Sequence, residues 1–180
     1  MRKKRYALLL LLALFAIALL PLAACYDGVK DGDFFWGVGG KDVFFGAWHW
    51  DGDRERMELT VPDEYEGKRV TALGGYAGRG VPCPFAVVLP ETFLADAVTD
   101  EATGDSYETL IFTVHLGKNI EEVYASAFHY YDCYEGDESV TVYKVVYRFT
   151  VDEENPAFTA VEGRLYRRGD TEPLDAFYYE

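Results

Sequence analysis

The sequence has few of the side chains that carry covalent and metal chemistry. Its 180 residues include only three histidines, three cysteines and three serines. None of the serines is flanked as Gly-x-Ser-x-Gly, so a hydrolase nucleophile has no local signature. No two histidines stand at the spacing of paired metal ligands. The composition therefore predicts a non-enzymatic protein with no metal site and no cofactor.

Two further site patterns fail on their spacing. The glycine-rich stretch 37–40 lies between predicted strands and precedes no helix that would hold a phosphate. Asp51, Asp53 and Glu55 have the alternate spacing that opens a calcium loop, but the central glycine and the distal glutamate are missing. A turn with solvated acids is the better interpretation. No pair of carboxylates is singled out for glycoside hydrolysis, so a glycosidase is only an alternative.

Residues 1–24 have the pattern of an export signal. Basic residues at positions 2–5 precede an apolar run that stops at Pro21, short of the ~20 residues of a spanning helix. The following Leu22-Ala23-Ala24-Cys25 resembles the lipobox of bacterial lipoproteins, in which the cysteine is acylated and becomes the first mature residue. The resemblance implies lipidation at Cys25 and a membrane anchor outside the cytoplasm. Ordinary secretory cleavage, with Cys25 a bystander, is the alternative.

The mature chain is strongly acidic. Four of the 17 basic residues lie in the leader, so its removal leaves 13 against 31 acidic residues and a net charge of −18. This charge argues against nucleic acid or anionic lipid as a partner. An aromatic content of 16% is too high for a disordered acidic tail. The chain is therefore expected to build a packed core.

The stretch 112–128, FTVHLGKNIEEVYASAF, reads as one unit of a repeat. Alternating apolar residues predict a short strand with one buried face, Gly117 ends it, and inward-pointing residues follow at wider spacing. Similar units begin near residues 57 and 86 and return after residue 145. The equivalent strand positions are Val61, Leu89, Leu116 and Val151. Their separations of 28, 27 and 35 residues indicate a repeat with insertions.

The units resemble those of bacterial leucine-rich-repeat surface proteins of the BspA type. VPDEYEGKRVTALGGYA, LGKNIEEVYASAF and, most specifically, VDEENPAFTAVEGRLY at 151–166 carry this resemblance, which covers about residues 57–177. It implies a mainly β fold: a short leucine-rich-repeat solenoid with parallel strands, on a surface protein that binds or adheres. Residues 57–180 would form about four coils, with insertions near 95–108 and 132–140. The predicted interior comprises Leu59, Val61, Val70, Leu73, Ala77, Val87, Leu89, Phe93, Val114, Leu116, Ile120, Val123, Ala127, Phe128, Val151, Phe158, Val161 and Leu165.

Residues 25–56 are rich in glycine and aromatics and predict an N-terminal β-hairpin cap over the first coil. Both faces of its second strand carry rings. Trp48 and Trp50 are therefore candidate ligand-binding residues for a sugar or a peptide, and Tyr130 and Tyr131 are weaker candidates. The alternative is that these rings cover the core.

Cys83 and Cys133 each follow an aligned alanine by six residues, so they occupy equivalent places in two units. With one coil between them they would stand about 9.5 Å apart, beyond the ~7 Å limit between Cα atoms for a disulfide. Two buried free thiols are therefore favoured over a bridge.

These patterns together predict a lipid-anchored bacterial cell-surface module. It would bind a host or envelope protein, or a glycan, through many small contacts. The alternative is a structural or accessory envelope subunit that pairs with a partner protein through an exposed sheet edge.

Overall fold

The computed structural model describes residues 27–39, 42–77, 81–97, 107–135 and 138–174. The predicted leader, Cys25 and most of the 95–108 insertion lie outside these ranges. Within them the protein is mainly β with one short helix, as predicted. In this part of the chain no helix has the length and apolar character needed to span a membrane.

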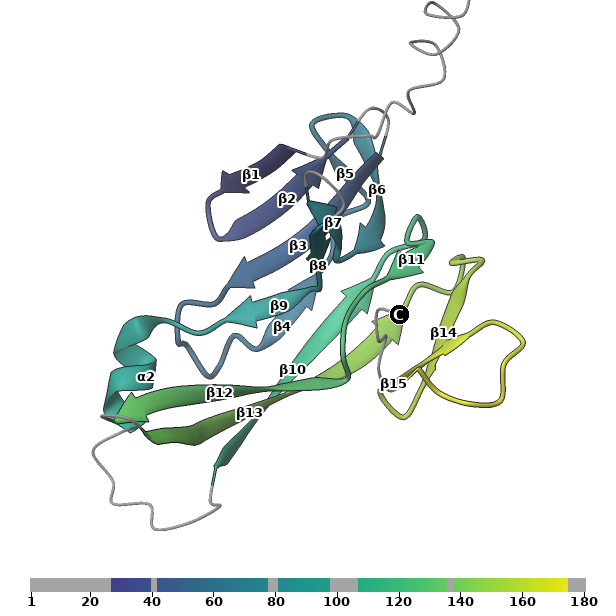
Figure 1. Cartoon of the computed structure of the whole chain (residues 1–180). Helices are drawn as coiled ribbons and strands as arrows, with labels where there is room; N and C mark the ends of the chain where they lie inside the picture. Colours follow the sequence, from purple (N-terminus) through teal and green to yellow (C-terminus); the bar gives the residue numbers. More distant parts are fainter. Residues whose placement is uncertain (1–26, 40–41, 78–80, 98–106, 136–137, 175–180) are drawn as a thin grey trace, which may run out of the picture.

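Fifteen strands and one helix follow one another through these ranges (Figure 1). They are β1 (Asp27–Asp31), β2 (Phe34–Val38), β3 (Asp42–His49), β4 (Glu58–Thr60), β5 (Glu64–Tyr65), β6 (Lys68–Leu73), β7 (Gly75–Ala77), β8 (Val81–Cys83), β9 (Ala86–Val88), α2 (Glu91–Ala97), β10 (Glu108–Leu116), β11 (Glu122–Val123), β12 (Phe128–Glu135), β13 (Glu138–Val151), β14 (Phe158–Val161) and β15 (Arg164–Arg167).

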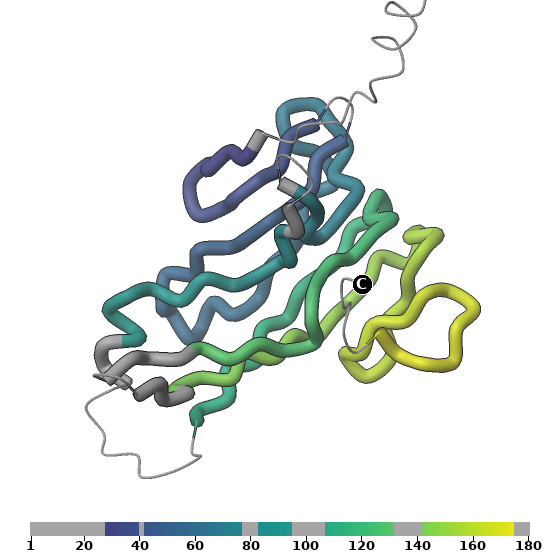
Figure 2. Tube along the Cα trace, viewed as in Figure 1, coloured from purple at the N-terminus to yellow at the C-terminus, as the bar shows by residue number. Residues whose placement is uncertain are grey.

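Two sheets contain most of these strands. Sheet A has the order β1-β2-β3-β6-β11, with β5 added to β6 and β9 added to β3. Sheet B has the order β12-β13-β10-β4. Figure 2 shows the N-terminal half of the chain on one side of the molecule, the segments of sheet B beyond it, and the β14–β15 hairpin at one end. The buried cluster draws its side chains from both sheets.

Sheet B contains three of the four predicted repeat strands in parallel, β4, β10 and β13. Leu59 of β4 pairs with Val114 of β10, and Leu116 pairs with Val151 of β13. Val61 extends the first pair, because its N–H donates to the His115 carbonyl at 3.0 Å. The predicted match of Leu73 with Val123 is also observed, as a parallel pair between β6 and β11 in sheet A. The predicted units that begin near residues 57 and 112 therefore lie side by side, because β4 pairs with β10 and β6 pairs with β11.

The predicted second copy is not part of this stack. Leu89 follows β9, which pairs in parallel with β3 of sheet A and not with the strands of sheet B. β6 and β9 follow one another along the same edge of β3, and the β7–β8 hairpin is an excursion between them. Gly74, at φ +69°, makes this exit possible, because a Cβ there would lie 2.3 Å from the Tyr124 carbonyl oxygen. The placement of Leu89 in the repeat ladder was therefore wrong.

The described residues of the predicted insertion near 132–140 belong to regular strands. Residues 128–135 and 138–151 are the two antiparallel strands of a hairpin, and β12 is the edge of sheet B. In β12 the alternation directs His129 inward, which leaves Phe128 43% exposed. Val161 is 53% exposed, because it precedes the turn at Glu162-Gly163, where both residues have positive φ. Neither Phe128 nor Val161 belongs to the core as predicted.

Asn155 is the one polar side chain that is fully buried in the described part of the chain, at 1% exposure. Its amide nitrogen donates to the carbonyls of Gly117 and Ile120, at 2.8 and 3.0 Å. Its oxygen accepts the N–H groups of Ala157 and Phe158, both at 2.8 Å. Asn155 thereby joins the turn after β10 to the chain after β13, and both its amide nitrogen and its amide oxygen have hydrogen-bond partners.

Candidate binding surfaces

Trp50 is a core residue and not an exposed ligand-binding ring. Its side chain is 2% exposed, and its indole N–H points at the carbonyls of Asp53 and Arg56, at 3.1 and 2.9 Å. The ring packs edge-on against Phe93 and Phe112, with centroids 5.1 Å apart in both pairs. The indole therefore holds the turn after β3, and the prediction of a binding role for Trp50 is wrong.

Trp48 is half-buried beside a shallow hollow of about 350 Å³. Its ring meets Phe112 edge-on, at 5.7 Å between centroids. The hollow is mainly acidic, because Arg56 is its one basic side chain and Asp33, Asp51, Glu55 and Glu58 line it as well. Arg56 pairs with Asp51 at 2.5 Å and with the neighbouring Asp53 at 2.8 Å, and its hydrogen bond lowers the pKa of Asp53. Trp48 is therefore a half-buried ring at the side of an acidic hollow.

Tyr130 and Tyr131 lie on opposite faces of β12. Tyr131 points toward sheet A, donates its O–H to the Val87 carbonyl, and has its pKa raised to about 12 by burial. Tyr130 points outward and is 45% exposed. Only Tyr130 of the pair is therefore available to an outside partner.

The inward face of β12 joins the two sheets through a polar bridge. The Tyr147 hydroxyl accepts the Val87 N–H at 2.9 Å and lies 3.0 Å from Nδ1 of His129. Burial lowers the pKa of His129 to about 4. A neutral imidazole fits this arrangement. Its Nδ1 accepts a hydrogen bond from the Tyr147 hydroxyl, and its proton is on Nε2, which has no hydrogen-bond partner. Sequence reasoning missed this bridge, since neither partner strand could be inferred from the pattern.

The outward face of sheet B carries a continuous set of exposed apolar side chains, here named the aromatic face. It consists of Tyr107, Ile111, Phe128 and Tyr130, each 39–45% exposed. Cross-strand registers bring them together, because Val146 stands between Ile111 and Phe128. Ring centroids lie 5.3 Å apart for Tyr107–Tyr130 and 5.5 Å apart for Phe128–Tyr130.

Lys144 supplies the positive charge of the aromatic face. Its Nζ lies 4.4 Å from the Phe128 ring centroid and 5.7 Å from that of Tyr130, within cation–π range. A groove of about 260 Å³ continues from Phe128 and Lys144 toward the β14–β15 hairpin, past Arg148 and Arg164. The region combines rings with basic side chains, although the whole chain carries a net charge of −14.

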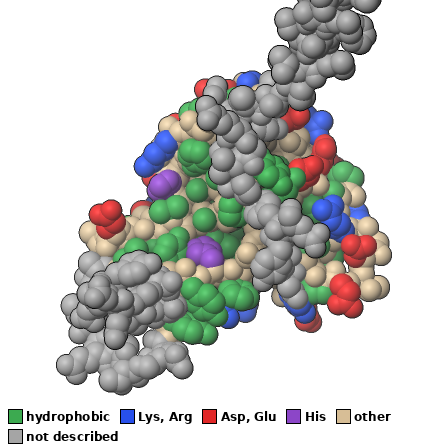
Figure 3. Space-filling view, viewed as in Figure 1, with side chains coloured by type: hydrophobic (Ala, Val, Ile, Leu, Met, Phe, Trp, Pro, Cys, Tyr) green, Lys and Arg blue, Asp and Glu red, His purple; other side chains and the backbone are tan. Residues whose placement is uncertain are grey.

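Figure 3 shows one side of the molecule, where hydrophobic side chains gather over the middle and charged side chains lie mainly toward the edges. Within the described ranges, no group of three or more histidine, cysteine or acidic side chains is arranged to hold a metal ion.

Cys83 is a free, half-buried thiol whose pKa is raised by burial. The prediction of two separated thiols assumed a coil between the cysteines, and that assumption is wrong because β9 lies in sheet A. The side chain of Cys133 lies outside what the structure describes.

No protein-family model matches the sequence, and no curated protein matches it either. Among solved structures, the chain is similar to the crystal structure of the pneumococcal vaccine antigen PcpA, with 9% sequence identity and a TM-score of 0.22. The similarity covers 81% of this chain and 55% of that one, so this chain spans about half the length of the other. A likeness at this level carries no argument about fold or function.

Proposed function

We propose that the protein is a lipid-anchored bacterial cell-surface module of the leucine-rich-repeat type, which binds a protein partner through the aromatic face of sheet B. It has no reaction centre in this proposal. Cys25 carries the lipid, and the anchor holds the module outside the cytoplasm with sheet B free to meet a partner.

Parallel strand pairing supports the solenoid part of the proposal. β4, β10 and β13 stack in the register expected for successive coils, and β6 stacks on β11 in the same way. Asn155 adds a contact between two successive turns. Stacked units bury a continuous interior that a single unit cannot bury alone.

The observation that carries the binding proposal is the clustering of exposed rings. Of the large apolar side chains that are exposed in the described ranges, four stand together on the aromatic face. Exposed apolar patches of this kind mark interaction sites, and aromatic residues dominate the energetics of protein interfaces. The adjoining basic side chains favour a partner surface that is itself acidic around its apolar centre.

Two double variants test the aromatic face. Phe128→Ser/Tyr130→Ser removes two of its rings, and the control Val161→Ser/Tyr166→Ser removes two apolar side chains from the β14–β15 hairpin. Both proteins, with wild type, are titrated by surface plasmon resonance against purified envelope and host-surface proteins. Any protein that binds wild type is expected to bind the first variant roughly 30-fold more weakly or worse, at about 2 kcal/mol for a central ring. Equal affinity for both variants would refute the assignment.

The lipid anchor has a separate test. In a bacterial host, the wild-type chain should incorporate labelled palmitate and sediment with membranes, and Cys25→Ser should lose both properties. A label that persists in Cys25→Ser would contradict the anchor and leave the proposal for the aromatic face unaffected.

Glycan binding is tested separately on a glycan array. A signal that is lost in Trp48→Ala would favour sugar recognition.

Strand addition at β1 is a second candidate function, with its own supporting observation. Within the described residues β1 pairs on one side only, and Val29 is 37% exposed. A partner strand could extend sheet A here, as in an accessory envelope subunit. Lys30 and Asp31 lie on this edge, and charges are the usual means of discouraging such pairing. Val29→Pro should abolish a complex formed in this way and leave binding at the aromatic face intact.

A further inference from the structure

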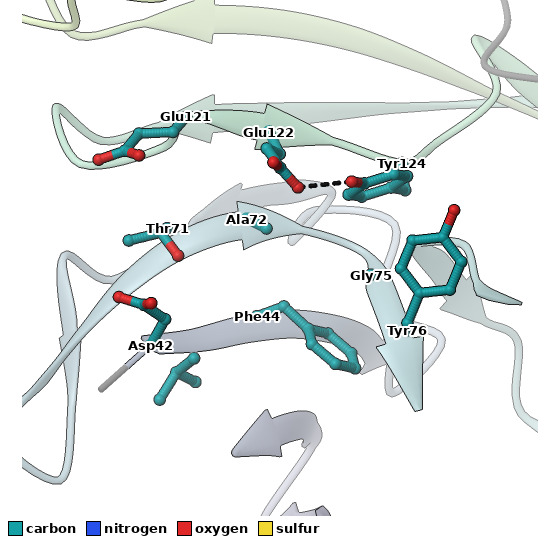
Figure 4. Close-up of a pocket in the computed structure, with 10 residues that line it drawn as sticks. Asp42, Phe44, Thr71, Ala72, Gly75, Tyr76, Glu121, Glu122 and Tyr124 are labelled. Atoms are coloured by element: carbon teal, nitrogen blue, oxygen red, sulfur yellow. Dashed lines mark hydrogen bonds between the residues drawn. The ribbon is translucent and has the colours of Figure 1, made fainter. Parts of the chain in front are cut away.

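A third hollow, a pocket, lies on the outward face of sheet A, where β3, β6 and β11 meet the start of β7 (Figure 4). Its volume is about 200 Å³. The side chains that matter for its chemistry are Asp42, Phe44, Tyr76, Glu121, Glu122 and Tyr124. None of them belongs to the aromatic face of sheet B, so the inference does not rest on the proposed function.

One end of the pocket is aromatic. The Phe44 ring forms its floor, and the Tyr76 and Tyr124 rings lie beside it. The two tyrosine rings meet edge to face, with their centroids 5.4 Å apart. Glycines leave room for the Phe44 ring to lie close to the sheet, because a Cβ at Gly37 or Gly75 would come within 1.9 or 2.8 Å of its atoms. Tyr76 is 39% exposed, so the aromatic wall is open to solvent.

The other end of the pocket is acidic. Figure 4 shows Asp42 and Glu121 at that end, on either side of Thr71, and Glu122 nearer the rings. Arg69 pairs with Glu121 at 2.7 Å and offsets its charge. Glu122 accepts the Tyr124 hydroxyl proton at 2.5 Å, a bond that aligns the carboxylate and leaves its negative charge in place. Asp42 and Glu122 therefore set the sign of the pocket.

We infer that this pocket receives a lysine or arginine side chain from a partner protein. The aliphatic stem of such a side chain would lie against the exposed Tyr76 ring, and its cationic group would pair with Glu122 while Asp42 adds negative charge at the far end of the pocket. A neutral apolar side chain would fill the aromatic end but leave the carboxylates without a counter-charge. An anion would be repelled by these carboxylates and by the net charge of the chain.

The test uses short peptides and the protein labelled with nitrogen-15. Acetyl-Gly-Ser-Lys-Ser-Gly-amide is titrated while the amide signals of Gly75, Tyr76 and Glu122 are followed by NMR. The same peptide with norleucine in place of lysine has the stem without the charge. The lysine peptide should shift these signals with a saturable, salt-sensitive response, and the norleucine peptide should bind at least severalfold more weakly.

Protein variants locate the response. Asp42→Asn and Tyr76→Leu should each weaken lysine-peptide binding about two- to fivefold, the range of one exposed ion pair or cation–π contact. Glu64→Gln, an exposed acid on β5 of the same sheet, is the matched control and should leave binding unchanged. Equal binding of both peptides, or equal effects of Asp42→Asn and Glu64→Gln, would overturn the inference. Both test positions are exposed, so the amide spectrum of each variant should show a folded protein.

Discussion

The outward faces of the two sheets carry similar aromatic residues, but the rings are buried on sheet A and exposed on sheet B. On sheet A, Phe44 is 3% exposed although it lies outside the main buried cluster, because its ring lies over the glycines at 37, 46 and 75. On sheet B, Phe128 contacts none of the described glycines in this way and is 43% exposed beside Lys144. Glycine in a strand thus lets an outward ring lie down and become buried, and a ring without such a glycine stays exposed.

Removing a ring from each face is the most direct way to break this comparison. Phe44→Ala should destabilise the protein by about 3 kcal/mol, as expected for a buried phenylalanine, and Phe128→Ala by less than about 1 kcal/mol. Urea unfolding followed by fluorescence measures both values. Equal losses would mean that the two faces do not differ as described.

The two faces of β12 respond differently to pH. The pKa of His129 is lowered from 6.5 to about 4, so the unfolded chain binds a proton in this range that the folded protein does not. Stability should therefore be fully present above about pH 6.5 and fall by up to about 3 kcal/mol as the pH drops toward 4. His129→Gln should flatten this part of the curve, whereas Tyr130→Ser on the outward face should leave its shape unchanged. A profile that is the same in wild type and His129→Gln would contradict the buried neutral imidazole.

A methyl group beneath the Phe44 ring sharpens the comparison. Gly37→Ala should cost about 2 kcal/mol, because its Cβ would overlap the ring and force it to move. In Gly37→Ala/Phe44→Ala the obstacle is gone, so the double variant should be clearly more stable than the sum of the two single losses predicts. Additive losses, measured by the same urea unfolding, would show that the ring does not lie over this glycine.

The smallest expected effect on stability belongs to Lys144. Lys144→Gln removes the cation from the rings of the aromatic face and should change the unfolding free energy by no more than about 0.5 kcal/mol. Its effect on partner binding should exceed that change, because the charge acts mainly at the interface. Arg167→Gln is the control, since this arginine lies over the Phe158 ring, away from the aromatic face.

The repeat register could be predicted because it depends on local rules. Val61, Leu116 and Val151 each end a strand with one buried face, and alternation identifies that face without knowledge of the neighbours. The pair Leu73–Val123 follows in the same way. The prediction that Leu89 lies in the repeat ladder was wrong because, after the β7–β8 hairpin, the chain returns to the edge of β3 as β9. That pairing is a long-range contact with no local signal.

The candidate site was less predictable than the fold. The sequence ranks Trp48 with Trp50 and Tyr130 with Tyr131, and only the turn after β3 and the antiparallel pairing of β12 distinguish the members of each pair. The Asn155 contacts were missed as well, although its place in the Asn-Pro-x-Phe segment was the available signal. The pocket on sheet A joins residues from β3, β6, β7 and β11, so no single stretch could have indicated it.

By itself, the sequence determined a β-rich protein with alternating buried faces and strand ends that pair in parallel. These features depend on periodicity and composition, which act over a few residues. The tertiary structure alone decided which rings are covered, which side of β12 is exposed and where acids meet aromatics. The reason is physical: exposure of a side chain depends on which distant strand or glycine lies beside it, and strand pairing across the chain decides that.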